Sequence, residues 1–333
     1  MKILYDGIVR NLQSYGGITV YFEEITRRLE MHEYKFVNFS SLRNDIYCDT
    51  NRRARLFERY RCFKTRSTDQ ECNIFHSTYY RFPKDNNFPV VTTVHDFTYE
   101  LYMRGIRKTI HSLQKNRAIQ NSDSIICVSQ NTAKDLLNFC DVDDKKIHVI
   151  YNGVSEAYKY LNLEEEEFIL FVGARAGYKN FELAVKAVAK LSNMKLKIVG
   201  GGTLSNSEIK LLTEYLDDKY EYLGKITNEH LNILYNTAYC LIYPSEYEGF
   251  GIPLLEAMRT GCPVIAVNRS SIPEVVGDSA ILVDRVSIDS LFSALLRVPL
   301  NRNELRYKGL LQSQKFSWDK CFSETYDLYK SLC

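Results

Sequence analysis

The sequence predicts an α/β protein built from two Rossmann-like domains, each with a doubly wound parallel sheet. Short apolar, β-rich runs alternate with segments of helical period along the chain, which is the pattern of βαβ units. Runs such as FILFV at 168–172 and CLIY at 240–243 are continuously apolar, as strands covered on both faces are. The length of 333 residues indicates about two domains at roughly 100–200 residues each.

Both halves of the chain carry this alternation. In the first half the expected strands are 2–5, 34–39, 74–76, 90–94, 124–128 and 147–151, and the expected helices are 17–28, 51–66, 106–121 and 130–139. In the second half the expected strands are 168–172, 195–199, 222–223, 239–243, 264–267 and 280–283, and the expected helices are 180–191, 205–216, 229–236, 253–260 and 288–296. A polar, acidic stretch at 155–167 is interpreted as a linker. The expected domains are therefore 1–154 and 168–316, followed by a last helical segment at 317–333.

The composition excludes several classes of protein. An apolar fraction of 45% and a charged fraction of 25% are ordinary for a globular protein and argue against wholesale disorder, collagen or a coiled-coil rod. The net charge of +2 is too small to indicate a nucleic-acid binder. That charge is uneven, because residues 1–150 carry a net +5 and residues 151–333 a net −3.

The sequence also favours a cytoplasmic protein. We find no signal peptide and no stretch near the ~18 apolar residues needed to cross a bilayer. The nine cysteines are scattered and form no C-x-x-C pair, which is typical of reduced thiols. These features leave room for peripheral contact with the cytoplasmic face of the inner membrane.

The most informative segment is YPSEYEGFGIPLLEAMRTGCPVIA at 243–266. It follows an apolar strand, turns through Gly249 and Gly251 and enters a helix, whose free N–H groups can receive an anion. Glu248 and Glu256 lie eight positions apart, so one carboxylate could hold a ligand's hydroxyls and the other a ribose diol. In the alternative interpretation, Glu256 is only a partner of the helix dipole.

Two bases follow the strand expected at 168–172. Arg175 and Lys179 lie in a Gly-containing loop that opens a helix. Cleavage of a sugar–phosphate bond builds negative charge on a diphosphate oxygen, and fixed cations in a water-poor site can stabilise that charge without a metal ion. Arg offers a planar fork and Lys a point charge. The alternative is a pair of exposed surface bases.

Two histidines stand at the carboxyl ends of expected strands, where open parallel sheets bind ligands. His95 follows the run at 90–94 and is a candidate for contact with a reacting group. For His76, contact with an acceptor and packing in the core are both open.

Three further patterns carry alternatives. VGGGTLS at 199–205 resembles a dinucleotide fingerprint, but Ser205 replaces the third glycine, so its glycines are expected to shape a nucleotide pocket. DVDD at 141–144 is interpreted as a solvated turn, and no metal site is expected. The stretch 51–66 carries seven Arg or Lys against one Glu, with interleaved apolar residues, and as a helix it would suit an anionic membrane surface. The alternative there is a solvated loop.

Several ordered motifs together resemble glycosyltransferase family four, a family of retaining GT-B glycosyltransferases with an E-x7-E region. The segment 243–266 resembles that region. The other matching segments are GGI at 16–18, VVTTVHDFTYE, IICVSQNTAKDLL, IHVIYNGV, FVGARAGYKNFELAVKAV and the terminal SWDKCFSETYDLY. The resemblance implies a GT-B fold, in which the two domains face each other across a cleft and the terminal helix returns to the first domain.

The resemblance also implies roles for particular residues. Glu256 would bind the ribose hydroxyls, Glu248 would contact the donor hexose, and Arg175 and Lys179 would neutralise the leaving diphosphate. His95 would lie near the anomeric centre. The remaining donor-side residues would be Gly16, Gly17, Gly200, Lys225, Ile226, Phe250, Gly251 and Ile252. The first domain would bind the acceptor, with His76, Arg52 and Arg53 on that side.

The sequence thus predicts a metal-independent retaining hexosyltransferase that needs no cofactor and uses a nucleotide diphosphate sugar as donor. The expected acceptor is a glycan or a lipid-linked intermediate of a surface polysaccharide such as O-antigen or capsule, with contact to an anionic membrane. Two alternatives stay open. One is a nucleotide-sugar epimerase or a sugar phosphorylase of the same fold, and the other is a non-catalytic nucleotide-binding protein.

Overall fold

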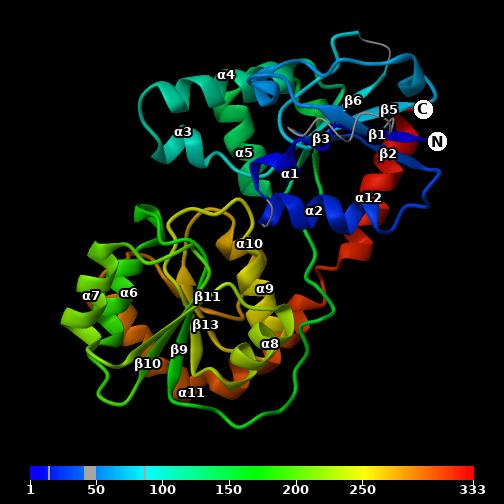
Figure 1. The fold of residues 1–333 in the computed structure, drawn as a ribbon. Helices are drawn as coiled ribbons and strands as arrows, with labels where there is room; N and C mark the ends of the chain where they lie inside the picture. The colour runs from blue at the N-terminus through cyan, green and yellow to red at the C-terminus, as the bar shows by residue number, and fades with distance from the viewer. Residues whose placement is uncertain (14–15, 41–49, 86–87) are drawn as a thin grey trace. The chain divides into compact units, whose positions relative to one another are not determined.

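A computed structural model describes residues 1–13, 16–40, 50–85 and 88–333 of the chain (Figure 1). Contacts divide these residues into two compact units. The first unit is Met1–Asn152 together with Trp318–Cys333, and the second is Gly153–Ser317. The segment 155–167 contains no helix or strand and belongs to the second unit.

The first unit is built on a six-stranded sheet in the order β2-β1-β5-β6-β7-β8, with every pair parallel. Its strands are β1 (Ile3–Tyr5), β2 (Tyr34–Phe36), β5 (Ile74–Ser77), β6 (Val90–Val94), β7 (Ser124–Cys127) and β8 (Ile147–Val149). Its helices are α1 (Val9–Leu12), α2 (Gly17–Thr26), α3 (Thr98–Tyr102), α4 (Ile106–Gln120), α5 (Gln130–Phe139) and α12 (Trp318–Ser331). A separate parallel pair joins β3 (Asn38–Ser40) to β4 (Asn51–Arg53), and short 3-10 turns occupy Glu58–Tyr60, Ser67–Asp69 and Asp144–Lys146.

The second unit contains a six-stranded parallel sheet in the order β11-β10-β9-β12-β13-β14. Its strands are β9 (Phe168–Val172), β10 (Lys195–Val199), β11 (Tyr220–Gly224), β12 (Cys240–Tyr243), β13 (Val264–Val267) and β14 (Ile281–Val283). Its helices are α6 (Phe181–Val188), α7 (Asn206–Leu216), α8 (Asn228–Thr237), α9 (Ile252–Arg259), α10 (Ile272–Val276) and α11 (Ile288–Ser313), with a 3-10 turn at Gly177–Lys179. The strand order reverses between β9 and β12, and ligands bind at such switch points in doubly wound sheets.

Helices cover both faces of the second sheet, with α6 and α7 on one side and α8 and α9 on the other (Figure 1). The strands β9, β12 and β13 are buried along their whole length, because their side chains meet helices on both faces. A core cluster of this unit joins residues of β9, β10, α6 and α11, including Ile169, Leu196, Val185 and Leu295. The fold is therefore the predicted α/β arrangement of two parallel-sheet units.

Most predicted elements are confirmed to within a few residues, but the helix expected at 51–66 is wrong. That segment forms β4, one 3-10 turn and extended chain. Arg52 explains the difference, because its guanidinium makes two hydrogen bonds, of 2.8 and 2.6 Å, to the buried carboxylate of Asp69. Pairing between β3 and β4 and this buried ion pair outweigh the helical period of the sequence.

Three further differences have local causes. The expected strand at 34–39 is divided between β2 and β3, which belong to different sheets. The helix expected to end at 296 continues to Ser313 past Pro299, because α11 packs on α6, α9 and β14 over its length. The helices α1, α3 and α10 are only four or five residues long and were not predicted.

The remaining observations concern one turn, the cysteines and the polarity of the helices. Asp143 caps the 3-10 turn at Asp144–Lys146 by accepting a hydrogen bond from the Lys145 N–H, so the DVDD run is the expected turn. The cysteines described are all free thiols, and Cys48 lies outside the described residues. Within the described ranges, every helix is too short or too polar to cross a membrane.

Candidate functional site

The connections that follow β9 and β12 meet at the switch point of the second sheet. The β9 connection contains Arg175 and Lys179, and the β12 connection contains Glu248. The Asn180 side chain donates a 3.0 Å hydrogen bond to the Pro244 carbonyl, and the Glu246 N–H donates one of 2.9 Å to the Tyr178 carbonyl. These bonds fix the two connections against each other, so polar side chains from both meet at one place.

Lys179 and Glu248 form an ion pair across this junction. Their side chains are 13% and 12% exposed, so the pair is largely shielded from water. The Glu248 backbone is held on both sides, since its N–H donates to the Ser270 Oγ at 2.9 Å and its carbonyl accepts from the Ser271 Oγ at 2.9 Å. A positioned cation and a positioned carboxylate therefore lie together where ligands bind in this class of sheet.

Glu256 lies on α9 beside two tyrosines. The Tyr235 hydroxyl donates a 3.0 Å hydrogen bond to its Oε2, and the Tyr158 hydroxyl also hydrogen-bonds to this carboxyl. Burial raises the pKa of Glu256 to about 7, because the charged form loses its hydration, while the two hydroxyls offset part of that rise. A carboxyl of this kind can accept hydrogen bonds from a ligand's hydroxyl groups once it is ionised.

Arg175 has its donors engaged inside the second unit. Its Nε donates to Glu208 at 2.7 Å, its Nη1 to the Gly200 carbonyl at 2.8 Å, and its Nη2 to the carbonyls of Gly201, Gly202 and Thr203 at 2.9–3.2 Å. The close fit needs a glycine, since a Cβ on Gly201 (φ +74°) would lie 2.3 Å from Nη1. In this structure Arg175 fixes the loop after β10, whereas the sequence had assigned it to a diphosphate.

The other predicted donor-side residues lie at the same end of the sheet. Gly251 ends the β12 connection with φ +98°, a conformation that favours glycine, and Phe250 and Ile252 flank it at the start of α9. The backbone N–H of Gly200 is already used, in a 2.7 Å bond to the Gly224 carbonyl. Lys225 and Ile226 follow β11 directly. The second-unit residues that the sequence selected thus lie in the loops after β9, β10, β11 and β12 or, for Ile252 and Glu256, on the helix α9 that follows.

In the first unit, His95 follows β6 directly and is half-buried. Its ring packs edge-on against Tyr21, with 5.2 Å between centroids, and burial lowers its pKa to about 4, so the ring is neutral at pH 7. Among the described residues, its Nε2 is buried without a hydrogen-bond partner. A buried polar atom without a partner is costly, and a bound ligand would satisfy it. Gly16 and Gly17 begin α2, where a Cβ on Gly17 would meet open space.

Two residues assigned to the acceptor side are instead core residues. His76 is fully buried, with its Nδ1 2.5 Å from the Tyr329 hydroxyl and its Nε2 2.8 Å from the Thr93 Oγ1. Arg52 is 7% exposed and is committed to Asp69. These contacts favour the packing interpretation of His76 and leave Arg52 no donor fork for an acceptor. Arg53, the next residue on β4, is exposed.

The residues that surround these groups were not predicted from the sequence. Tyr158 lies in the stretch interpreted as a linker, and Tyr235 lies on α8. Both pack against Glu256, with 5.9 Å between their ring centroids. Glu208 was visible only as the third residue of a capping box on α7. No sequence spacing could have linked these positions to Glu256 or Arg175, because the fold alone brings them together.

Comparisons with known proteins agree with this geometry. The model for "Glycosyltransferase Family 4" matches residues 15–158, and the model for "Glycosyl transferases group 1" matches residues 156–308. The two matches follow each other along most of the chain. Together the two matches identify the class of this protein as a glycosyltransferase. The chain belongs to glycosyltransferase family four with the GT-B fold.

Two relatives are named as O-antigen chain mannosyltransferases. The chain is 41% identical over 114 residues to O-antigen chain mannosyltransferase B of Escherichia coli, covering 33% of this chain and 30% of that protein. It is 30% identical over 211 residues to O-antigen chain mannosyltransferase RfbU of Salmonella typhimurium, covering 62% and 60% of the two chains. The structure of Anabaena Alr3699/HepE in complex with UDP and glucose superposes with a TM-score of 0.76 at 15% identity, covering 99% of each chain, and this likeness concerns the fold.

Proposed function

We propose that this protein transfers a hexose from a nucleotide diphosphate sugar to a hydroxyl of a glycan acceptor, with retention of the anomeric configuration. The observation that carries the proposal is the shielded Lys179–Glu248 pair at the switch point of the second sheet, next to the helix that presents Glu256. From the family resemblance we assign the same residues to leaving-group stabilisation and to binding of the donor hexose and ribose.

In the proposed reaction the bond between the anomeric carbon and the diphosphate oxygen breaks, and the acceptor oxygen bonds to that carbon from the same face. The departing phosphate oxygen takes the acceptor's proton, so atoms and charge balance without a covalent enzyme intermediate. Lys179 exchanges its partner Glu248 for the developing phosphate charge, and the backbone N–H groups around Gly251 add to this stabilisation. Glu248, once released, accepts hydrogen bonds from the hexose.

Arg175 takes a different role from the one the sequence suggested. Its hydrogen bonds to the 200–203 carbonyls hold the loop that follows β10, so we assign it to shaping the nucleotide pocket. His95 is assigned to a donor-sugar hydroxyl, which would give its buried Nε2 a partner.

For the donor we propose a nucleotide diphosphate mannose, and for the acceptor a lipid-linked polysaccharide intermediate of the O-antigen type. The support is the two mannosyltransferase relatives, which are named for O-antigen chains. The test is a screen of purified protein with UDP-, GDP- and dTDP-hexoses and membrane-extracted lipid acceptors. Mannose should enter the lipid fraction from one donor, and failure with every donor would overturn the proposal.

The experiment can be made specific to the site. Glu248→Gln and Glu256→Gln should each abolish transfer, whereas Glu246→Gln, on the same loop, should retain it and serve as the control. Transfer should also persist in EDTA, because the proposal gives leaving-group stabilisation to Lys179 and to backbone N–H groups. Product NMR that shows an inverted linkage would contradict the retaining mechanism.

The alternative functions predict different outcomes in the same donor screen. An epimerase would convert the nucleotide sugar without an acceptor, and a phosphorylase would need inorganic phosphate. A non-catalytic binding protein would bind nucleotide without transfer and would leave cellular function intact after Glu248→Ala.

A further inference from the structure

Lys115 of α4 is a lysine that the fold buries almost completely. Its side chain is 1% exposed, and its ammonium group donates a 2.8 Å hydrogen bond to the Glu100 Oε2 and a 2.9 Å hydrogen bond to the Asp96 carbonyl. A buried ammonium group is costly unless its charge is paired and its N–H groups have acceptors. Here the carboxylate balances the charge, and the carbonyl belongs to the loop that follows β6. Lys115 therefore holds the residue next to His95.

Two aromatic rings enclose this ammonium group. The Lys115 Nζ lies 4.2 Å from the centroid of the Phe97 ring and 5.3 Å from that of Tyr80, and both rings are buried. The attraction between a cation and a ring face is strongest where water is excluded. Because Phe97 follows Asp96 directly, two consecutive residues of the loop after β6 contact the same ammonium group.

Glu100 of α3 fixes the ammonium group from the opposite charge. Its Oε1 accepts a 3.0 Å hydrogen bond from the Ser112 Oγ and lies 3.7 Å from the His111 Nδ1. Burial alone would raise the pKa of Glu100, but His111 and Lys115 lower it to about 2. The carboxylate is therefore ionised at neutral pH and gives Lys115 a full counter-charge.

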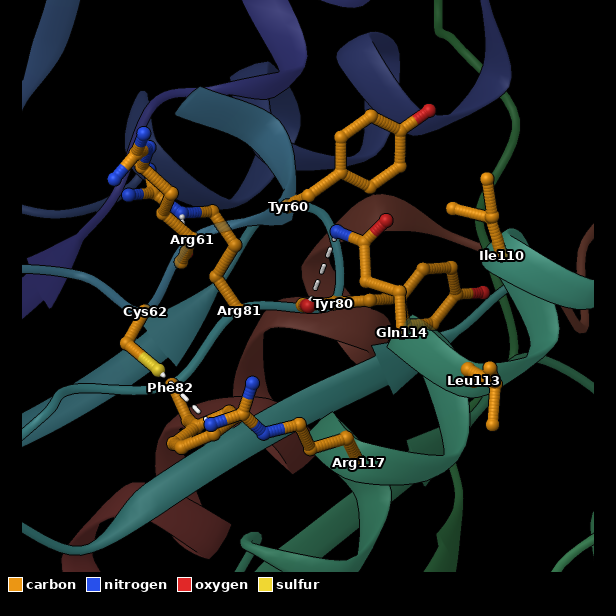
Figure 2. Close-up of a pocket in the computed structure, with 10 residues that line it drawn as sticks. All are labelled: Tyr60, Arg61, Cys62, Tyr80, Arg81, Phe82, Ile110, Leu113, Gln114 and Arg117. Carbon is orange, nitrogen blue, oxygen red and sulfur yellow. Dashed lines mark hydrogen bonds between the residues drawn. The ribbon is translucent and has the colours of Figure 1, made fainter. Parts of the chain in front are cut away.

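The residue before Lys115 holds the neighbouring loop. The Gln114 Nε2 donates to the Arg59 carbonyl at 2.6 Å and to the Tyr80 carbonyl at 3.3 Å, and Figure 2 shows Gln114 and Tyr80 on the two sides of this contact. Tyr80 adopts φ +50°, a left-handed conformation that a bulky residue rarely takes. Such strain persists where the surroundings fix it, and it clusters at functional sites. Consecutive residues of α4 thus hold the chain after β5 and the chain after β6.

The ammonium group also acts on the charge of the His95 ring. Burial lowers the pKa of His95 to about 4, Asp96 opposes this shift, and the positive charge of Lys115 adds to it. The other titratable groups around His95 are uncharged at neutral pH: Tyr21, His76 and Tyr80. Lys115 therefore supplies the positive charge that, together with burial, keeps this ring neutral.

We propose that Lys115 is a positioning residue, which fixes the loop after β6 and thereby the orientation of the His95 ring toward a donor-sugar hydroxyl. Lys115 is too deeply buried to contact a substrate, so it acts through His95. This role rests on the proposed transfer function, whereas the hold of Lys115 on the His95 loop does not. A reacting group displaced by about 1 Å can cost ~10²-fold in rate, so the loop has to be held closely.

The test uses two variants of the full-length protein. Lys115→Met/Glu100→Gln neutralises both members of the buried pair, which avoids leaving a buried carboxylate without its partner. The matched control is Lys35→Met in β2. Lys35 is also a buried lysine, 7% exposed, that donates to a backbone carbonyl, that of Thr68, at 2.9 Å, but β1 and β5 separate its strand from β6. Thermal melting checks that both variants fold.

The first readout is the titration of the His95 imidazole by NMR of histidine-labelled protein, with His95→Gln to assign its signal. The pKa of about 4 should persist in the Lys35→Met control. In the double variant it should rise toward the ordinary value of 6.5, because a nearby positive charge is lost. An unchanged pKa in the double variant, or an equal rise in the control, would overturn the proposal.

The second readout is kinetic. The double variant should lose about tenfold or more in kcat, whereas the control should keep its kcat. The Kd of the nucleotide alone should stay unchanged in both, because the nucleotide pocket is assigned to the second unit. An intact kcat in the double variant would refute the positioning role. If the unchanged protein turns over no donor, the proposed function fails, and the His95 titration still decides whether Lys115 holds this loop.

Discussion

At the scale of single residues, Glu256 links the candidate site to the stability of the second unit. Its pKa of about 7 lies above the ordinary value of 4.5, so the folded protein holds this proton more tightly than the unfolded chain does. The protonated carboxyl is compatible with folding below pH 4.5. As pH rises through 7, the buried carboxylate forms, and the stability that the protonated carboxyl contributes to the folded state is lost.

The first prediction follows from the upward direction of this pKa shift. Glu256→Gln removes the titration but keeps an acceptor for the Tyr235 hydroxyl, so the variant should melt higher than the unchanged protein at pH 8 and nearly equally at pH 5. Nucleotide affinity should fall at the same time, because the ribose loses its carboxylate. Scanning calorimetry at both pH values and nucleotide titration measure the two effects. If the melting temperature of the variant, measured relative to the unchanged protein, does not rise between pH 5 and pH 8, the raised pKa is contradicted.

Lys179 carries the second prediction. Lys179→Met keeps the length of the side chain and removes its charge, so the leaving phosphate loses a fixed cation. We expect kcat to fall by ~10²–10³, as for loss of one preorganised transition-state donor. Steady-state kinetics measure this. The exposed Lys210 of α7 gives a charge-matched control, as Lys210→Met should leave kcat unchanged.

Arg175 carries the third prediction, with a different kinetic signature. Lysine cannot reproduce the planar fork that holds Glu208 and the glycine-loop carbonyls, so Arg175→Lys should loosen that loop. The donor KM should rise about tenfold while kcat changes less than in Lys179→Met. A large fall in kcat with unchanged KM would place Arg175 on the leaving group instead.

At the scale of elements, the basic segment 50–69 contains a buried carboxylate that is paired with buried bases. Asp69 accepts hydrogen bonds from Arg52 and lies 3.1 Å from the Lys35 Nζ, and both bases are buried with it. These partners lower the pKa of Asp69 despite its burial. The ionised Asp69 therefore stabilises the fold at pH values above the pKa that this carboxyl has in the unfolded chain. That stabilisation is lost as the pH falls through the lower pKa of Asp69 in the folded protein.

The fourth prediction concerns this ion pair. Arg52→Met should destabilise the protein by ~3–5 kcal/mol, because it leaves a buried carboxylate without its main partner. Arg53→Met, one residue along β4 and exposed, should change stability by less than about 0.5 kcal/mol. Urea denaturation of both variants measures the difference. Equal effects would mean that Arg52 is not committed to Asp69.

The same elements show how far sequence reasoning extends. Nearly every strand could be predicted from a continuous apolar run. A strand that is buried on both faces is apolar at each position, so a run of about five residues is enough to identify it. The helix expected at 51–66 failed because its period came from residues that serve a turn, a strand pair and two buried ion pairs. The end of α11 was missed at Pro299, where tertiary packing overrides a residue that normally stops helices.

The residues of the site could likewise be predicted only where a local sequence pattern marks them. Lys179, Glu248 and Glu256 could be selected because they lie in the loop or the first helical turns that follow an apolar strand, which is a local signal. Tyr158, Tyr235 and Glu208 could not, because only folding brings them to their carboxyl and guanidinium partners. His76 had the same strand-end signal as His95, and burial beside Tyr329 distinguishes the two.

At the scale of the whole molecule, α12 completes the first unit from the far end of the chain. The Tyr329 hydroxyl lies 2.5 Å from the His76 Nδ1 and 3.0 Å from the Tyr5 hydroxyl, and Arg28 pairs with Asp319. Burial lowers the pKa of His76 to about 3, so the ring stays neutral and depends on these partners.

The fifth prediction tests this arrangement. Tyr329→Phe keeps the ring packing but removes the hydroxyl, leaving a fully buried imidazole nitrogen unsatisfied, so the first unit should lose ~1–3 kcal/mol. Hydrogen exchange should rise in β1 and β5 and stay unchanged in β9 and β12. Tyr326→Phe is the milder control, because the Tyr326 hydroxyl donates to Glu33 in a bond that is only partly buried. Loss of protection in both units alike would contradict a local role.

The return of the chain also sets an order of events during synthesis on the ribosome. The first unit consists of residues 1–152 and 318–333, so its sheet emerges early but lacks α12 until residues 318–333 follow. The second unit, 153–317, is contiguous and can fold as soon as it has emerged, although it is made later. Until residues 318–333 emerge, the α12-facing surface around Tyr5 and His76 is uncovered, so a stop after Ser317 would leave a finished second unit attached to an incomplete first one.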